Sequence, residues 1–228
     1  MKKNIKKTVI VSAIIAVLMI GGISAYFTSI DSAENTWTVG NVEVELLEPG
    51  YDQFNETEAK DMTPNKVIHK DPKVQNTGTN DAFVFLKFSV PKANVATAAQ
   101  DGTKQDAALQ ELFDYAINDG WVKVAEDTSG TDKNTYVFAF GTESACTALA
   151  KNEETPVLFK NTEAAGMAEA GTVGMITFKN IIEGQGLEDL TLKIPVEAFA
   201  IQTTDLTASD AASPADVWRI INNQNSIL

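Results

Sequence analysis

Apolar and polar residues alternate along much of the chain, which is the pattern of β-strands that bury one face. The strongest example is the segment 83–91, in which Val84, Leu86, Phe88 and Val90 form one wholly apolar face. This pattern predicts a core-facing strand. Weaker patterns predict further strands at 37–46 with a turn or bulge at Gly40 and Asn41, at 67–76 with a break at Pro72, and at 121–127, 135–141, 156–161, 173–182 and 187–202.

Helical spacing is confined to the middle and the end of the chain. Between 106 and 120, apolar residues recur at intervals of three and four, which predicts an inserted helix that ends at a glycine. Ser213, Pro214 and Asp216 form a capping pattern, which predicts a C-terminal helix. Trp218 on that helix is expected to cover an open end of the β-structure. We expect a loop at 53–61 and a helical passage at 143–152.

Short strands separated by polar turns, without a regular alternation of strand and helix, favour a mainly β protein. The arrangement expected is an antiparallel two-sheet sandwich with one inserted helix and a C-terminal helix. No internal repeat and no long linker divides the sequence. We therefore predict one β-sandwich domain over residues 36–228.

The first 25 residues have the organisation of a signal peptide. Four lysines precede an apolar run at 8–20, and small residues follow it up to Ala25. We expect cleavage between Ala25 and Tyr26, and an uncleaved N-terminal anchor is the alternative. Residues 26–35 are polar and weakly patterned, so we expect them to form an extended arm.

The expected cleavage also changes the charge of the chain. It removes four lysines and no acidic residue, which shifts the net charge from −13 to −17. So acidic a surface repels nucleic acid and anionic lipid head groups, and we expect neither nucleic acid nor membrane as a partner after cleavage. It favours solubility and makes association sensitive to salt or divalent cations.

Residues that could support catalysis are scarce. His69 is the only histidine and is expected at the surface, so no two-histidine zinc site and no Ser-His-Asp or Cys-His system can be assembled. Cys146 is the only cysteine and lies among small apolar residues, as a buried structural thiol would. The segment 127–132 lacks the spacing of a calcium-binding loop, and a weak calcium site between loops stays an open alternative. We predict no catalytic residue, no cofactor and no metal ligand.

Several segments point to a known family. Gly21 and Gly22, Ala25 and the aromatic pair Tyr26 and Phe27 precede a polar arm and the strand TVGNVEVEL. This order resembles the start of TasA-like and camelysin-like exported proteins of Gram-positive bacteria, which have a SipW-type signal peptide. The block KDPKVQNTGTNDAFVFLKFSVP and the late segments EAFAIQTTDL and ADVW are similar to other parts of the same family.

The resemblance implies a jelly-roll-like sandwich that is exported and cut by a SipW-type signal peptidase. It also implies subunits of extracellular biofilm-matrix fibres, in which the N-terminal arm of one subunit completes the sheet of the next. Camelysin-like members have been classed as metalloproteases, but this chain lacks the histidines for that chemistry, and we do not carry the activity over. The arm residues in the matching place are Tyr26, Phe27, Thr28, Ser29, Ile30 and Asp31.

We therefore expect a secreted, non-catalytic structural protein in the extracellular matrix or at the cell surface. Its expected partners are the signal peptidase, further copies of itself and other matrix proteins. One alternative is a monomeric cell-surface binding or adhesion module, whose arm folds back on its own domain. The other is an unrecognised hydrolase, camelysin-like proteolysis included.

Overall fold

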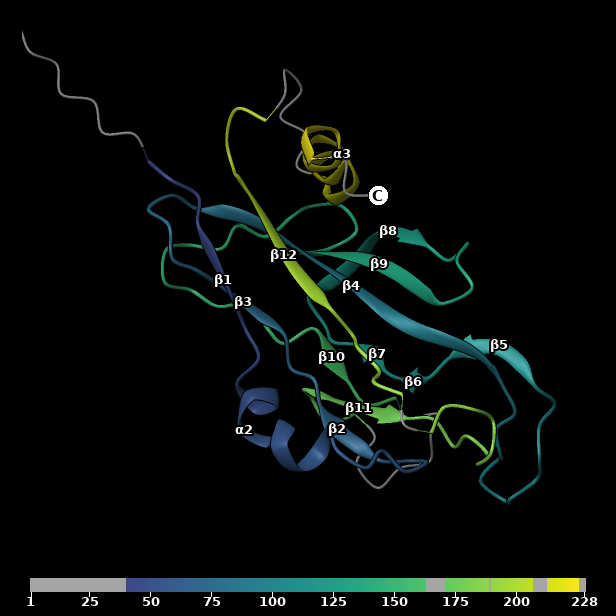
Figure 1. Cartoon of the computed structure of the whole chain (residues 1–228). Helices are drawn as coiled ribbons and strands as arrows, with labels where there is room; N and C mark the ends of the chain where they lie inside the picture. Colours follow the sequence, from purple (N-terminus) through teal and green to yellow (C-terminus); the bar gives the residue numbers. More distant parts are fainter. Residues whose placement is uncertain (1–39, 163–170, 189, 207–212, 226–228) are drawn as a thin grey trace, which may run out of the picture. The chain divides into compact units, whose positions relative to one another are not determined.

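The computed structural model describes residues 40–162, 171–188, 190–206 and 213–225. The predicted signal peptide and arm lie outside these residues. The described part is mainly β and contains two helices, and all of its strand pairs are antiparallel (Figure 1). The prediction of a mainly β, antiparallel fold with two helices is confirmed, although the inserted helix lies elsewhere in the sequence.

The largest sheet has the strand order β12-β4-β9-β8, and β5 pairs with the far end of β4. The central strand is β4, because it pairs with three others. Its predicted apolar face is confirmed, since Val84, Leu86, Phe88 and Val90 are at most 1% exposed. The strands of this sheet are β4 (Ala82–Val95), β5 (Ala108–Glu111), β8 (Trp121–Asp127), β9 (Lys133–Phe140) and β12 (Val196–Gln202).

Three small sheets form the opposite layer (Figure 1). Their side chains share one core with the inner face of the large sheet, where Val74, Phe159 and Ile176 pack in the same cluster as Leu86 and Phe88. Two layers around one core make a sandwich. The small sheets pair β1 (Val44–Leu47) with β3 (Lys73–Asn76), β7 (Ala116–Ile117) with β10 (Phe159–Lys160), and β11 (Met175–Phe178) with both β2 (Val67–His69) and β6 (Phe113–Asp114).

The outer face of the large sheet is covered by α3 (Pro214–Asn225). Trp218 of this helix packs on Phe85 of β4. The predicted cap is present, since the Ser213 hydroxyl oxygen accepts a 3.3 Å hydrogen bond from the Asp216 N–H and donates one of 2.6 Å to the Asp216 carboxylate. The C-terminal helix is thus confirmed. The expected place of Trp218 at an open end was wrong, because β4 is apolar on both faces and its outer face needs a cover.

The helix predicted at 106–120 is also wrong. This segment forms the three short strands β5, β6 and β7. Leu109 is 47% exposed, whereas Leu112 and Phe113 are buried, so the apolar residues do not share one helical face. Backbone pairing with β4, β11 and β10 outweighs the local helical spacing.

The inserted helix is α2 (Pro49–Glu58), which covers residues expected to end a strand and form a loop. Its proline occupies the first turn, where no intrahelical N–H is needed. The N-terminal cap comes from a distant residue: Asp71 accepts hydrogen bonds from the N–H groups of Gly50 (2.7 Å) and Tyr51 (3.0 Å). Neither α2 nor α3, the helices of the described part, has the length and apolar character of a membrane span.

Two further segments differ from expectation. Residues 143–152 form no helix, and isolated bridges fix them instead, one of which joins Leu149 to Ala82. The strand predicted at 187–202 is shortened to β12. Pro195 precedes this strand and has no N–H to donate to a ladder, although its carbonyl accepts a 3.1 Å hydrogen bond from Ser89.

Candidate functional site

His69 of β2 contacts α2 through its side chain. Its Nδ1 lies 2.8 Å from a carboxylate oxygen of Glu58, and its ring stacks on Phe54 with centroids 4.5 Å apart. The helix approaches closely at Gly50, where a Cβ atom would lie 2.8 Å from the His69 ring. The imidazole is 27% exposed, so His69 lies only partly at the surface. These contacts are those of a residue that holds a helix in place.

A buried ion pair lies beside the start of α2. Lys70 Nζ is 2.8 Å from Oε1 and 3.0 Å from Oε2 of Glu48, and both side chains are less than 20% exposed. Burial raises the pKa of Glu48 above its ordinary value, and the Lys70 ammonium opposes that rise. The two charges therefore neutralise each other inside the protein.

Glu111 of β5 gathers three hydrogen-bond donors. Its Oε1 accepts from Tyr136 and Asn134 at 2.7 Å each, and its Oε2 accepts from Tyr115 at 3.2 Å. Burial, with the hydrogen bond to Glu111, raises the pKa of Tyr136 to about 12. Burial raises the pKa of Tyr115 as well. Both phenols stay protonated at neutral pH, so this cluster links strands and does not exchange protons there.

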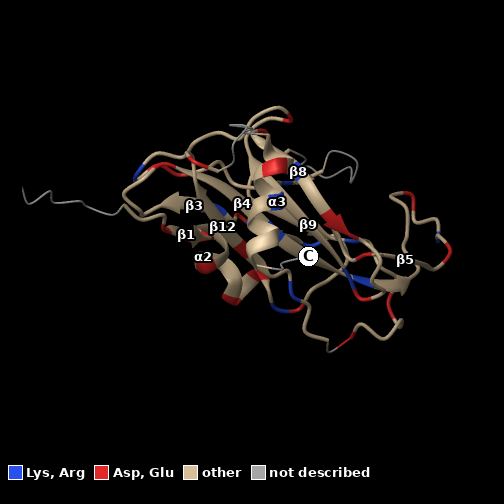
Figure 2. Cartoon of the chain, turned by 90° about the horizontal axis from the view of Figure 1, so that it is seen from above, with Lys and Arg blue, Asp and Glu red and all other residues tan. Residues whose placement is uncertain are grey.

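The lone cysteine and the segment 127–132 are also explained by structural roles. Cys146 is half-buried rather than fully buried, and burial raises the pKa of its thiol to about 11, which keeps it protonated at neutral pH. In the segment 127–132, the Asp127 carboxylate accepts hydrogen bonds from the N–H and hydroxyl groups of Ser129. Acidic residues are spread over several elements, including α2 and the loops around β5 (Figure 2).

The strand β12 presents a free backbone edge. It pairs with β4 along all seven residues without a bulge, and no described residue pairs with its other side. The Ser89 N–H bonds to the Pro195 carbonyl, and hydrogen-bonded pairs alternate along antiparallel strands. The N–H and C=O groups that point to the free side therefore belong to Val196, Ala198, Ala200 and Gln202.

The opposite edge of this sheet, β8, has features that protect an edge from further pairing. It carries a bulge between Lys123 and Ala125 and ends in Glu126 and Asp127. By contrast, the only charged residue of β12 is Glu197, which pairs with Lys87 at 3.0 Å. Edges without bulges, prolines or several charges recruit further strands.

The free side of β12 faces a corner of the sandwich. Strand β1 runs beside β12, with Cα atoms within 8 Å, and yet the two strands are not paired (Figures 1 and 2). Val44 of β1 and Ala198 and Ala200 of β12 pack against the core but are only partly buried. Within the described residues, the outward backbone groups of β12 thus have no strand partner, and the apolar side chains at this corner are only partly buried.

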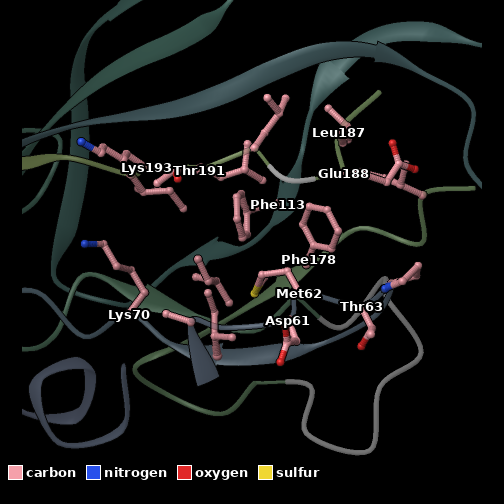
Figure 3. A pocket seen from close by; sticks show the side chains of 18 of the residues that line it. Asp61, Met62, Thr63, Lys70, Phe113, Phe178, Leu187, Glu188, Thr191 and Lys193 are labelled. Carbon is pink, nitrogen blue, oxygen red and sulfur yellow. The ribbon is translucent and has the colours of Figure 1, made fainter. Parts of the chain in front are cut away.

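A cavity of about 900 Å³ lies elsewhere in the domain, between β2, β6, β11 and the segments 59–64, 181–188 and 190–195. Met62, Phe113 and Phe178 point into it (Figure 3). Lys70 and Lys193 lie at one end, and Leu187 and Glu188 at the other (Figure 3). The wall is largely apolar, as is usual for sites that bind small molecules.

Residues 1–133 match the family described as camelysin metallo-endopeptidase. The chain belongs to the camelysin family. TasA-like proteins are members of this family, so the resemblance found in the sequence is confirmed. The matched part of this camelysin-family chain includes α2 and the strands from β1 to β8. No curated protein and no solved structure matches the chain.

The description of the family points to a metal-dependent peptidase, and the side chains described here do not fit such a centre. A catalytic zinc ion takes three protein ligands, usually with more than one histidine among them. The sequence has one histidine, and Glu58 already engages it. Across the described residues, no three His, Cys, Asp or Glu side chains lie close enough together to hold a metal ion.

The predicted cleavage residues Ala25 and Tyr26 and the arm from Tyr26 to Asp31 lie outside the described residues and stay predictions. Sequence reasoning missed both the free edge of β12 and the apolar cavity. The alternation of apolar residues around 190–198 was a signal for the strand itself. Which strand becomes an edge depends on long-range pairing, and that pairing has no local signature.

Proposed function

We propose that this camelysin-family protein is a secreted, non-catalytic structural subunit of extracellular biofilm-matrix fibres. In this proposal the N-terminal arm of one subunit adds as a strand to the sandwich of the next. The observation that carries it is the edge of β12, which is seven residues long, unbulged and unpaired among the described residues. The poor fit of the described side chains to a zinc centre favours a structural role over proteolysis.

The arm has properties that suit strand addition. Residues 26–35 are more numerous than those of β12, and strands rise about 3.3 Å per residue, so the arm can cover the whole edge. Each backbone hydrogen bond formed contributes about 1 kcal/mol net. Tyr26, Phe27 and Ile30 can also bury apolar surface against the partly buried side chains of the β12 corner.

Cleavage would couple export to assembly. A SipW-type signal peptidase acting between Ala25 and Tyr26 frees the arm only once the domain is outside the cell. Before that step the arm is tethered to the signal peptide. Assembly therefore takes place at the cell surface or in the matrix, with other copies of the chain and with other matrix proteins as partners.

The test uses the purified exported chain and two proline variants. Ala198→Pro removes an N–H that points to the free side of β12 and leaves the ladder to β4 in place. Lys123→Pro is the matched control, because the Lys123 N–H points away from β9 at the protected edge β8. Electron microscopy and sedimentation velocity should show fibres for the wild type and Lys123→Pro. Ala198→Pro and a chain lacking 26–35 should stay monomeric.

Two results would overturn the proposal. A wild-type chain that stays monomeric at every concentration would favour the monomeric adhesion module instead. Cleavage of casein by the purified chain that a chelator abolishes would show that the protein is a metalloprotease. Circular dichroism of each proline variant verifies that the sandwich is intact before assembly is scored.

A further inference from the structure

The apolar cavity is a candidate binding site that strand addition does not use. Its volume of about 900 Å³ falls within the range of small-molecule sites. Met62, Phe113 and Phe178 converge on its centre (Figure 3), and Ile68, Leu192 and Ile194 complete its apolar wall. An apolar space of this size, open to the solvent, favours a ligand that buries hydrocarbon.

The cavity is open because the segment before β12 does not join a sheet. Residues 187, 188 and 190–194 line the cavity and form no strand, although apolar and polar residues alternate from 190 to 194. Leu192 and Ile194 turn toward the core and are partly buried, whereas Leu190 lines the cavity and is 58% exposed. Leu190 therefore adds exposed apolar surface to the wall of the cavity.

Two cations and three carboxylates line the cavity, namely Lys70, Lys193, Asp61, Glu183 and Glu188. Lys70 and Lys193 lie at the same end (Figure 3). Lys70 is neutralised by Glu48, whereas Lys193 is exposed and forms no ion pair with any described residue. At the other end, the Glu188 carboxylate accepts hydrogen bonds from the N–H groups of Gly184 and Gly186, and so stays within its own loop.

We propose that this cavity binds a long-chain fatty-acid anion, with the hydrocarbon chain among Met62, Phe113 and Phe178 and the carboxylate at Lys193. Lys193, which has no ion-pair partner among the described residues, complements one anionic head group. The carboxylate of Glu188 at the far end disfavours a second anionic group there. This proposal does not rest on fibre assembly, because the cavity and the free edge of β12 involve different residues.

The experiment is calorimetric titration of the purified exported chain with myristate below its micelle-forming concentration. Myristate should bind at one site per chain. Laurate, which is two methylenes shorter, should bind more weakly by about fourfold per methylene. A cationic amphiphile with the chain length of myristate should bind more weakly than myristate does.

Two variants test the two parts of the site. Lys193→Gln should weaken myristate binding by about two- to fivefold, as expected for an exposed ion pair, and the exposed Lys151→Gln should leave it unchanged. Met62→Trp fills the middle of the cavity and should abolish binding. Thermal melting verifies that both variants are folded, and Lys193→Gln tests the site even if Met62→Trp does not fold.

Four outcomes would overturn the proposal. They are the absence of myristate binding, an affinity that does not depend on chain length, equal binding of the cationic amphiphile, and undiminished binding by a folded Met62→Trp variant. A synthetic peptide of residues 26–35 that binds the cavity of a chain unable to bind myristate would assign the cavity to the arm instead.

Discussion

Trp218 of α3 packs its indole against the Phe85 ring of β4, with the ring centroids 5.7 Å apart and the planes tilted by 38°. Phe199 of β12 meets the same indole edge-on, also at 5.7 Å. One side chain of the C-terminal helix thus contacts both the central strand and the free edge strand. The outer face of the large sheet depends on this helix for its burial.

Trp218→Ala should therefore lower the free energy of unfolding strongly. Removal of a buried tryptophan leaves a large cavity, and a loss of about 3–5 kcal/mol is expected. Urea unfolding followed by circular dichroism measures this loss. Arg219→Ala is the control, since that side chain is 69% exposed, and its effect should stay within about 0.5 kcal/mol. A loss of less than about 1 kcal/mol for Trp218→Ala would contradict the packing described here.

Asp71→Ala should destabilise α2 in particular. The Asp71 carboxylate accepts the N–H groups of Gly50 and Tyr51 and is 8% exposed, so its removal should cost about 1–2 kcal/mol. Relative to the wild type, Asp71→Ala should accelerate backbone hydrogen exchange more in α2 than in β4. The exposed Asp81→Ala is the matched control and should leave both rates unchanged. Equal acceleration in α2 and β4 would mean that Asp71 supports the whole domain rather than this helix.

The cluster around Glu111 predicts a loss of stability at alkaline pH. The pKa of Tyr136 is about 12 in the folded protein against an ordinary value of 10.0, so the folded state keeps a proton that the unfolded state releases. The stabilisation that Tyr136 contributes to the folded state is complete below pH 10 and is lost as the pH rises through 12. In a Cys146→Ala background, which removes the thiol of similarly raised pKa, the free energy of unfolding should fall across this window.

Tyr136→Phe in the same background should make that alkaline decline shallower, and the decline that remains belongs to Tyr115, whose pKa burial also raises. Urea unfolding at several pH values between 9 and 11.5 makes the comparison. The hydroxyl also donates to Glu111 at 2.7 Å, so this variant should be less stable than its background at pH 8. Parallel curves for the two proteins would show that Tyr136 does not carry the pH dependence.

The strands that sequence reasoning predicted correctly are those whose alternation reflects their own burial. One face of β4 is buried, and it carries Val84, Leu86, Phe88 and Val90. The local alternation of apolar residues predicts this face directly. The polar turn between β8 and β9 is equally local. In these elements, the local preference and the tertiary environment agree.

Two of the three helix errors, at 106–120 and at α2, have one physical origin. The spacing at 106–120 suits a helix, but pairing with three other strands stabilises the extended form. The residues of α2 show no buried stripe, and their cap is Asp71, 20 residues from Tyr51 along the chain. Contacts with residues so far along the chain determine whether these segments form helix or strand, and a short stretch of sequence does not indicate them.

The candidate site was predictable only in part. Family resemblance and the absence of a second histidine both follow from the sequence alone. The free edge of β12 and the cavity result from strand order and from residues 190–194, which alternate in sequence like a strand but do not form one. Pairing partners determine both features, and the sequence specifies those partners only through the complete fold.

The contrast between β12 and β8 has a consequence for the shape of any polymer. A subunit with one receptive edge, β12, and one donating segment makes one link forward and one link back, and the bulged, charged β8 offers no branch point. Such head-to-tail contacts do not close upon themselves as a two-fold dimer does. In the assembly proposed above, the product would be an unbranched, directional filament whose two tips differ: one would display a vacant β12, and the other an unengaged N-terminal segment.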